Sequence, residues 1–266
     1  MNQIRALLNR FPRLKALLRR SLRVILPGRG VSTHYVEMAA DEKDSESARL
    51  RMAWVNDGMP ARQRELVDRQ LAAYRQGEQV DVFDVLVKSL RDLEGVAAPM
   101  RVLEVGCSSG YYSEVFRITQ LDVDYTGCDY SEPFVELARQ RYPGVPFDVQ
   151  DATALVYADN TYDVVISGCC LLHIPEYQAG VAETARVASR YAIFHRTPVV
   201  LGQPNKYYRK QAYGVETVEI HFNEPQFLQL LADSGLELMA THTLDETVRH
   251  GVGSATRTYV CRKKVT

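Results

Sequence analysis

The stretch 102–113, which reads VLEVGCSSGYYS, constrains the fold of this chain most strongly. A short apolar run carries one acid, Glu104, and leads into Gly106 and Gly110, after which a helical pattern begins. This order predicts a buried strand, a tight loop and the start of a helix. Such a loop brings backbone N–H groups close to a ligand, because glycine adopts backbone conformations that other residues avoid.

The spacing in this loop separates two classes of ligand. A loop that binds a dinucleotide reads G-x-G-x-x-G, with glycines placed for the approach of a pyrophosphate. Here the middle glycine is absent and a carboxylate, Glu104, precedes the turn. A carboxylate repels a pyrophosphate and suits a ligand with a cationic end. S-adenosylmethionine carries a sulfonium and an ammonium group and no phosphate, so it fits the loop better.

Two later strand patterns also end in acids. Asp129 closes the pattern at 122–129, about 20 residues past the loop, where related folds place an acid on ribose hydroxyls. Asp151 closes the pattern at 146–151 and is suited to accept a hydrogen bond from an adenine amine. Helical patterns separate the strands, and this alternation predicts a mostly parallel, doubly wound α/β sheet.

The glycine loop with its acid, the two strand-end acids and Asp163 at the start of the fourth strand occur in a fixed order. This set resembles the class I (Rossmann-like) S-adenosylmethionine-dependent methyltransferases over about residues 80–262. The resemblance implies a seven-stranded sheet with an antiparallel last strand, an N-terminal helical appendage and S-adenosyl-L-methionine as cofactor. It also implies a set of cofactor-binding residues: Glu104, Gly106, Cys107, Gly110, Asp129, Tyr130, Asp151, Ala152, Ser167 and Gly168.

The chain divides into three parts: a basic amphipathic segment at 1–30, a helical cap at 31–79, and an S-adenosylmethionine-binding methyltransferase domain at 80–266 with an insertion at 199–222. In the cap, residues 31–44 are polar and are expected to form a loop. Helices are expected over 45–57, 60–76, 80–93, 109–118, 131–141, 176–188 and 224–234, and late strands over 191–195, 236–244 and 255–262.

The segment 1–30 contains eight Arg or Lys residues and no acid, so the remaining chain carries a net charge of −9. Its charges interrupt the apolar residues, which argues against a secretory signal or a spanning helix. Two interpretations stay open: contact with an anionic membrane surface, or packing on its own domain or on a second subunit. We expect a cytoplasmic protein, with peripheral attachment at the inner face of the membrane as the alternative.

Two histidines are candidates for a general base, which a hydroxyl acceptor requires. His173 lies in the loop after the fourth strand, and His195 ends the fifth strand. The alternative for His173 is a packing or capping role. In the insertion, alternation at 216–222 predicts a short strand with a polar face. Four basic residues nearby could meet a phosphate or carboxylate on the acceptor, or could be solvated: Arg196, Lys206, Arg209 and Lys210.

The leading functional prediction is O-methylation of a small-molecule or sugar/glycan-type acceptor. It is strengthened by a narrower resemblance to methyltransferases associated with bacterial surface-polysaccharide synthesis. A lipid or quinone acceptor is the nearest alternative, and a cofactor-binding scaffold without catalysis is a second. Nucleic acid is not expected as a partner, because the body is acidic and Phe11 is the only aromatic residue in the basic segment. The five cysteines show no metal-ligand spacing, so no metal is expected.

Overall fold

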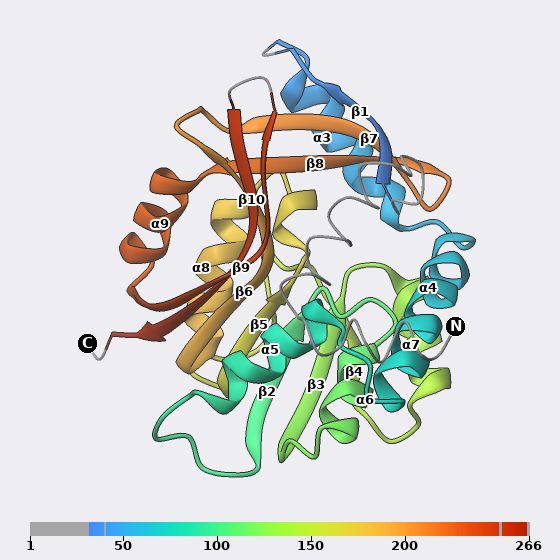
Figure 1. Cartoon of the computed structure of the whole chain (residues 1–266), viewed down its shortest axis with the longest axis vertical. Coiled ribbons are helices and arrows are strands. Elements are labelled where there is room, and N and C mark those ends of the chain that lie inside the picture. Colours follow the sequence, from blue (N-terminus) through green and yellow to red (C-terminus); the bar gives the residue numbers. More distant parts are fainter. Residues whose placement is uncertain (1–31, 40, 250–251, 265–266) are drawn as a thin grey trace, which may run out of the picture.

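The computed structural model describes residues 32–39, 41–249 and 252–264, and shows a ten-stranded mixed sheet flanked by helices (Figure 1). The basic segment predicted at 1–30 lies outside the described residues. None of the helices in the described part combines the length and the apolar character that a membrane-spanning helix requires.

Strands and helices alternate through the central part of the described chain. The strands are β1 (Ser32–Glu37), β2 (Met100–Val105), β3 (Val123–Asp129), β4 (Phe147–Val149), β5 (Tyr162–Gly168), β6 (Ala188–Leu201), β7 (Lys206–Ala212), β8 (Val215–Asn223), β9 (Leu236–Arg249) and β10 (Val252–Lys263). The helices are α3 (Lys43–Arg51), η1 (Met52–Trp54), α4 (Met59–Arg75), α5 (Asp81–Arg91), α6 (Tyr111–Ile118), α7 (Glu132–Arg141), η2 (Leu171–His173), α8 (Tyr177–Val187) and α9 (Glu224–Asp233).

Seven strands form the arrangement that the sequence predicts. They lie in the order β4-β3-β2-β5-β6-β10-β9, with parallel pairs from β4 to β6 and with β10 antiparallel to both of its neighbours. The prediction of a mostly parallel, doubly wound sheet is therefore confirmed, including the antiparallel last strand.

The prediction of seven strands is too low, because three more strands extend the same sheet. β6 continues to Leu201, beyond His195, the last residue at which it pairs with β5. In this extension, Val199 and Val200 of β6 pair with β8. β8 pairs with β7, and β1 pairs with β7 in antiparallel orientation. Figure 1 shows β7 and β8 crossing the top of the molecule. The predicted strand at 216–222 is thus part of β8, and the loop predicted at 31–44 contains β1.

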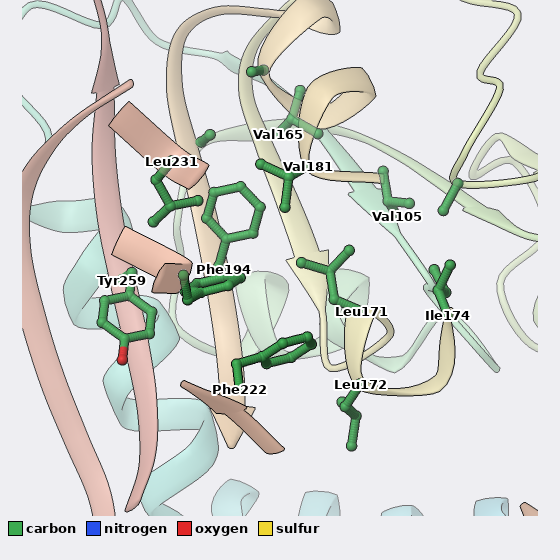
Figure 2. Close-up of a cluster of buried hydrophobic side chains, with 14 of the residues drawn as sticks. Val105, Val165, Leu171, Leu172, Ile174, Val181, Phe194, Phe222, Leu231 and Tyr259 are labelled. Atoms are coloured by element: carbon green, nitrogen blue, oxygen red, sulfur yellow. The ribbon is translucent and has the colours of Figure 1, made fainter. Parts of the chain in front are cut away.

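Alternate residues along the central strands enter two separate apolar cores, one on each face of the sheet. On β5, Val165 joins the core beneath α8 and α9, whereas Val164 and Ile166 join the core beneath α5 and α6. Figure 2 shows the first core, in which Phe194 lies among Val181 and Leu231. Burial on both faces is expected of a parallel sheet covered by helices, because successive strand side chains point to opposite faces.

Helix α5 shows how the sequence specifies this packing. Its buried residues Phe83, Leu86, Val87 and Leu90 recur at the helical spacing of three and four. These four residues join the second core. Asp84 lies in the first turn of the helix and Lys88 in the last turn, where the helix dipole favours an acid and a base respectively. The packing of α5 on the sheet thereby holds the central strands in place.

Candidate active site

A pocket of about 390 Å³ lies at the carboxyl ends of the parallel strands. The loop after β2 and the ends of β3, β5 and β6 form its floor, and residues of η1, α4 and the β7–β8 insertion complete its walls. Ligands of open α/β sheets bind at this edge, where the loops leave the sheet in opposite directions.

Gly106 and Gly110 both adopt left-handed backbone conformations, with φ of +76° and +70°. A Cβ on Gly106 would lie 2.4 Å from the Cβ of Cys170, and one on Gly110 would lie 2.4 Å from the ring of Phe147. No side chain fits at either position. Gly106 lines the pocket, whereas Gly110 begins α6 and packs against β4.

Four of the residues expected to bind the cofactor lie behind the pocket wall instead of lining it. They are Glu104, Cys107, Gly110 and Ser167. The reason is burial, since Glu104, Cys107 and Ser167 are each at most 2% exposed.

Glu104 accepts a hydrogen bond of 2.5 Å from the Tyr125 hydroxyl, and burial raises its pKa to about 8. Its carboxyl group is therefore largely neutral at pH 7 and does not supply the negative charge expected from the sequence. It shapes the site from below, because a Cβ on Gly168 would lie 2.6 Å from its Oε1.

Asp129 lies on the pocket wall, and the loop around it fixes its orientation. The backbone N–H of Ser108 donates to one carboxylate oxygen at 2.9 Å, and the N–H of Ser131 donates to the other at 3.0 Å. Burial raises the pKa of Asp129, while these N–H donors oppose the rise. The neighbouring Tyr130 also lines the pocket and donates its hydroxyl to the carbonyl of Arg51.

Asp151 and Ala152 line the pocket beside them. The Asp151 carboxylate accepts hydrogen bonds from Thr153, and its second oxygen accepts from Arg51 Nη2 at 2.6 Å. Burial raises the pKa of Asp151, but these hydrogen bonds outweigh it and leave the pKa lowered. The sequence prediction missed Arg51, because nothing near position 51 indicates that the cap folds onto a strand end so far along the chain.

Strained backbone is concentrated around the pocket. Ser108, Cys169, Arg196 and Tyr213 have φ of +53°, +62°, +59° and +48°, and all four line the pocket. Such conformations cost a non-glycine residue of the order of 1 kcal/mol or more and tend to persist where they serve function.

His173 lines the pocket in an arrangement suited to a base. Its Nδ1 lies 2.6 Å from the carbonyl oxygen of Val218, which can only accept, so Nδ1 carries the proton and Nε2 carries the lone pair. The ring lies 4.4 Å, centroid to centroid, from the ring of Trp54. Burial lowers the pKa of His173 to about 3, which keeps the imidazole neutral at pH 7.

His195 does not lie on the pocket wall, which corrects the second candidate for a base. It is 1% exposed, its Nε2 lies 2.9 Å from the Tyr112 hydroxyl, and its Nδ1 lies 2.9 Å from Thr258 Oγ1. Both ring nitrogens are thus occupied, and burial lowers its pKa. The sequence places His195 correctly near the end of the strand segment that pairs with β5. Its side chain points into the core, however, and the next residue, Arg196, faces the pocket.

A buried polar cluster closes the side of the pocket formed by the insertion. Glu219 accepts hydrogen bonds from Lys210 and, at 2.7 Å, from His221 Nε2. Burial raises the pKa of Glu219, but His221 and Lys210 outweigh that effect and lower it. Lys210 is therefore paired, which the sequence did not show.

Comparison with known proteins agrees with this geometry. Residues 103–194 match a family model described as a methyltransferase domain. Residues 103–194 of this chain are therefore similar to methyltransferase domains. The chain is also 34% identical over 96 residues to a demethylmenaquinone methyltransferase of Renibacterium salmoninarum, covering 36% of this chain and 40% of that protein. Over 96 residues it is 33% identical to phosphoethanolamine N-methyltransferase 3 of Arabidopsis thaliana, covering 35% and 19% of the two chains.

The match thus spans less than half the length of either curated relative. The fold of the methyltransferase domain also resembles the 1,6-didemethyltoxoflavin-N1-methyltransferase of Burkholderia thailandensis, whose structure holds S-adenosylhomocysteine. The TM-score is 0.57 at 18% identity, covering 87% of this chain and 94% of that one. Such a likeness supports the fold.

The residues of the pocket fit S-adenosylmethionine. Asp129 and Asp151 offer carboxylate acceptors at the ends of adjacent strands, which suits ribose hydroxyls and an adenine amine. Gly106 and Gly168 line the pocket at the point where β2 and β5 end. Because neither residue has a side chain, the backbone is accessible there. Asp129, Tyr130, Asp151 and Ala152 would hold the adenosine part, and Gly106 and Gly168 the methionine part.

Proposed function

We propose that this chain transfers a methyl group from S-adenosylmethionine to a hydroxyl group of a small-molecule or sugar-type acceptor. One observation carries the proposal: a single pocket joins Asp129 and Asp151 to the neutral imidazole of His173. The first two residues suit the cofactor, and the third suits an acceptor that must lose a proton.

His173 is the residue proposed to take that proton. Its Nδ1–H is held by the Val218 carbonyl, so the lone pair on Nε2 is the one that remains for an acceptor hydroxyl. Contact with Trp54 restrains the ring. General bases contribute about 10²–10⁴ in rate when their pKa lies near the operating pH. Burial lowers the pKa of His173 and so weakens it as a base, which places its expected contribution at the lower end of that range.

When bound, the cofactor would supply an electrophilic methyl group on a sulfonium sulfur: the C–O bond to the acceptor would form as the C–S bond breaks, and the thioether S-adenosylhomocysteine would leave. The protein's contribution is to hold the acceptor oxygen in place and to remove its proton at His173 Nε2. Positioning of this kind contributes strongly to rate, because aligned groups behave as if at very high local concentration. Trp54 also lines the pocket, and its indole Nε1–H is buried without a partner among the described residues.

A quinone-type compound is a second candidate acceptor, supported by the name of the Renibacterium relative. The Arabidopsis relative is named for phosphoethanolamine, an amine, so the relatives by themselves do not select the acceptor.

The test is a methyl-transfer screen with S-adenosylmethionine labelled in its methyl group, read by mass spectrometry over polar and lipid fractions of cell extract. We expect a product that gains the labelled methyl group in the polar fraction. His173→Gln should lower its initial rate by about 10² or more, and His242→Gln, on β9 away from the pocket, should not. Absence of any labelled product with the wild-type protein contradicts the proposed activity, and a product in the lipid fraction favours the quinone-type acceptor.

A further inference from the structure

Arg196 is a part-buried cation on the pocket wall that the proposed reaction does not use. It follows His195 on β6, adopts a left-handed conformation with φ of +59°, and lines the pocket beside Cys169 and Tyr213. Among the described residues, its guanidinium forms no ion pair and no hydrogen bond through its side chain.

The other basic residues that the sequence indicated for acceptor binding are all neutralised. Lys206 pairs with Glu37 at 2.9 Å, Arg209 pairs with Glu46 at 3.3 Å, and Lys210 pairs with Glu219. Lys206 and Arg209 also lie outside the pocket wall. Arg196 differs from all three because it lacks a carboxylate partner in the described structure, and it differs from Lys206 and Arg209 also because it lines the pocket.

Among the described residues, no carboxylate forms an ion pair with Arg196, and the groups that act on it most strongly are not carboxylates. Cys169 acts on it most strongly. Tyr111, Tyr112 and Tyr213 also act on it electrostatically, but burial raises the pKa of each phenol, that of Tyr213 to about 12. These phenols are neutral at pH 7. A part-buried charge without a partner is costly, and here it is also held on strained backbone.

We propose that Arg196 binds an anionic group, a carboxylate or a phosphate, on the methyl acceptor. The planar guanidinium offers paired N–H donors that match either oxyanion. The location favours the acceptor as the source of that group, because Arg196 lies toward Tyr213 of the insertion, whereas Asp129 and Asp151 mark the adenosine part of the pocket. The inference rests on the proposed function and selects acidic acceptors from the hydroxyl compounds that it allows.

Calorimetry can test this before the acceptor is known. Inorganic phosphate is titrated into the full-length protein saturated with S-adenosylhomocysteine, for the wild type and for Arg196→Gln, Arg196→Lys and Arg209→Gln. S-adenosylhomocysteine affinity and thermal unfolding are measured for each variant, so that a folding defect is recognised. Arg209→Gln is the matched control, because it removes a guanidinium from β7 without changing the pocket wall.

We expect Arg196→Gln to weaken phosphate binding by about tenfold or more, as loss of a charge-assisted hydrogen bond does, and to leave S-adenosylhomocysteine affinity unchanged. Arg196→Lys should retain part of the binding and Arg209→Gln all of it. Equal phosphate binding by wild type and Arg196→Gln, or no phosphate binding by the wild-type complex, overturns the inference. A tenfold loss of S-adenosylhomocysteine affinity in Arg196→Gln also overturns it, by assigning Arg196 to the cofactor carboxylate. Failure of the wild type to bind S-adenosylhomocysteine instead refutes the proposed function itself.

Discussion

Replacing Gly106 with alanine tests whether the loop after β2 has room for any side chain. The new Cβ would lie 2.4 Å from the Cβ of Cys170 and 3.0 Å from its Sγ, in a backbone conformation with φ of +76°. Left-handed backbone costs an alanine about 1–2 kcal/mol, and overpacking adds about 1–3 kcal/mol. Gly106→Ala should therefore lower the free energy of unfolding by about 2–5 kcal/mol.

Gly77 provides a matched control. It has the same φ of +76°, and nothing lies within 4 Å of the position of its Cβ. Gly77→Ala carries the backbone strain and the change in the unfolded chain without the collision. The difference between the two variants, about 1–3 kcal/mol, isolates the contact with Cys170.

The assay is urea unfolding followed by circular dichroism, combined with calorimetric titration of S-adenosylhomocysteine. Because the collision displaces the end of β5 from the loop after β2, Gly106→Ala should also weaken cofactor binding, and Gly77→Ala should not. The double variant Gly106→Ala/Cys170→Gly removes the colliding Cβ and should recover part of the loss. Equal costs for the two alanine variants would refute the close approach.

Three further predictions concern titratable groups. Burial raises the pKa of Glu104 from about 4.5 to about 8, so the native protein keeps a proton that the unfolded chain releases, and this group's contribution to stability falls as pH rises from 4.5 to 8. Glu104→Gln has no ionisable group at this position. In urea titrations, the free energy of unfolding of Glu104→Gln relative to that of the wild type should therefore rise between about pH 5 and pH 8. A difference that stays constant over this range contradicts the prediction. Glu219→Gln alone should cost about 3–5 kcal/mol, because it leaves the buried Lys210 without its carboxylate partner, whereas Lys210→Met should cost less, because His221 still donates to Glu219; the double variant should cost less than the sum, and additive losses in the double-mutant cycle exclude the pairing. His173 has a pKa of about 3, and its neutral form is lost only as pH falls through that value, so the initial rate of methyl transfer should show no step near pH 6.5; a step there contradicts the assignment.

The parts of the fold that periodicity controls were predictable from the sequence. The spacing of Phe83, Leu86 and Leu90 specifies α5, and the apolar runs ending in Asp129 and Asp151 specify adjacent strand ends. β1 was not predictable, because it is a polar edge strand whose pairing with β7 depends on residues far along the chain.

The site was predictable at the level of strand ends but not of side-chain direction. Asp129 and His173 line the pocket as the sequence indicates, whereas Glu104 and His195 turn into the core. Along a strand, successive side chains point to opposite faces, so a one-residue difference decides whether a position such as 195 or 196 meets the ligand. Arg51 is a longer-range case, since its contact with Asp151 arises only once the cap has folded onto the sheet.

The central claim is that the pocket at the carboxyl ends of the strands binds S-adenosylmethionine through its strand-end acids. Calorimetric titration of S-adenosylhomocysteine into the wild type and into Asp129→Ala tests it most directly. We expect the wild type to bind S-adenosylhomocysteine at one site per chain. Asp129→Ala should bind it at least about tenfold more weakly, because Asp129 offers a charged acceptor on the pocket wall. No binding by the wild type, or equal affinity for the two proteins, would contradict it.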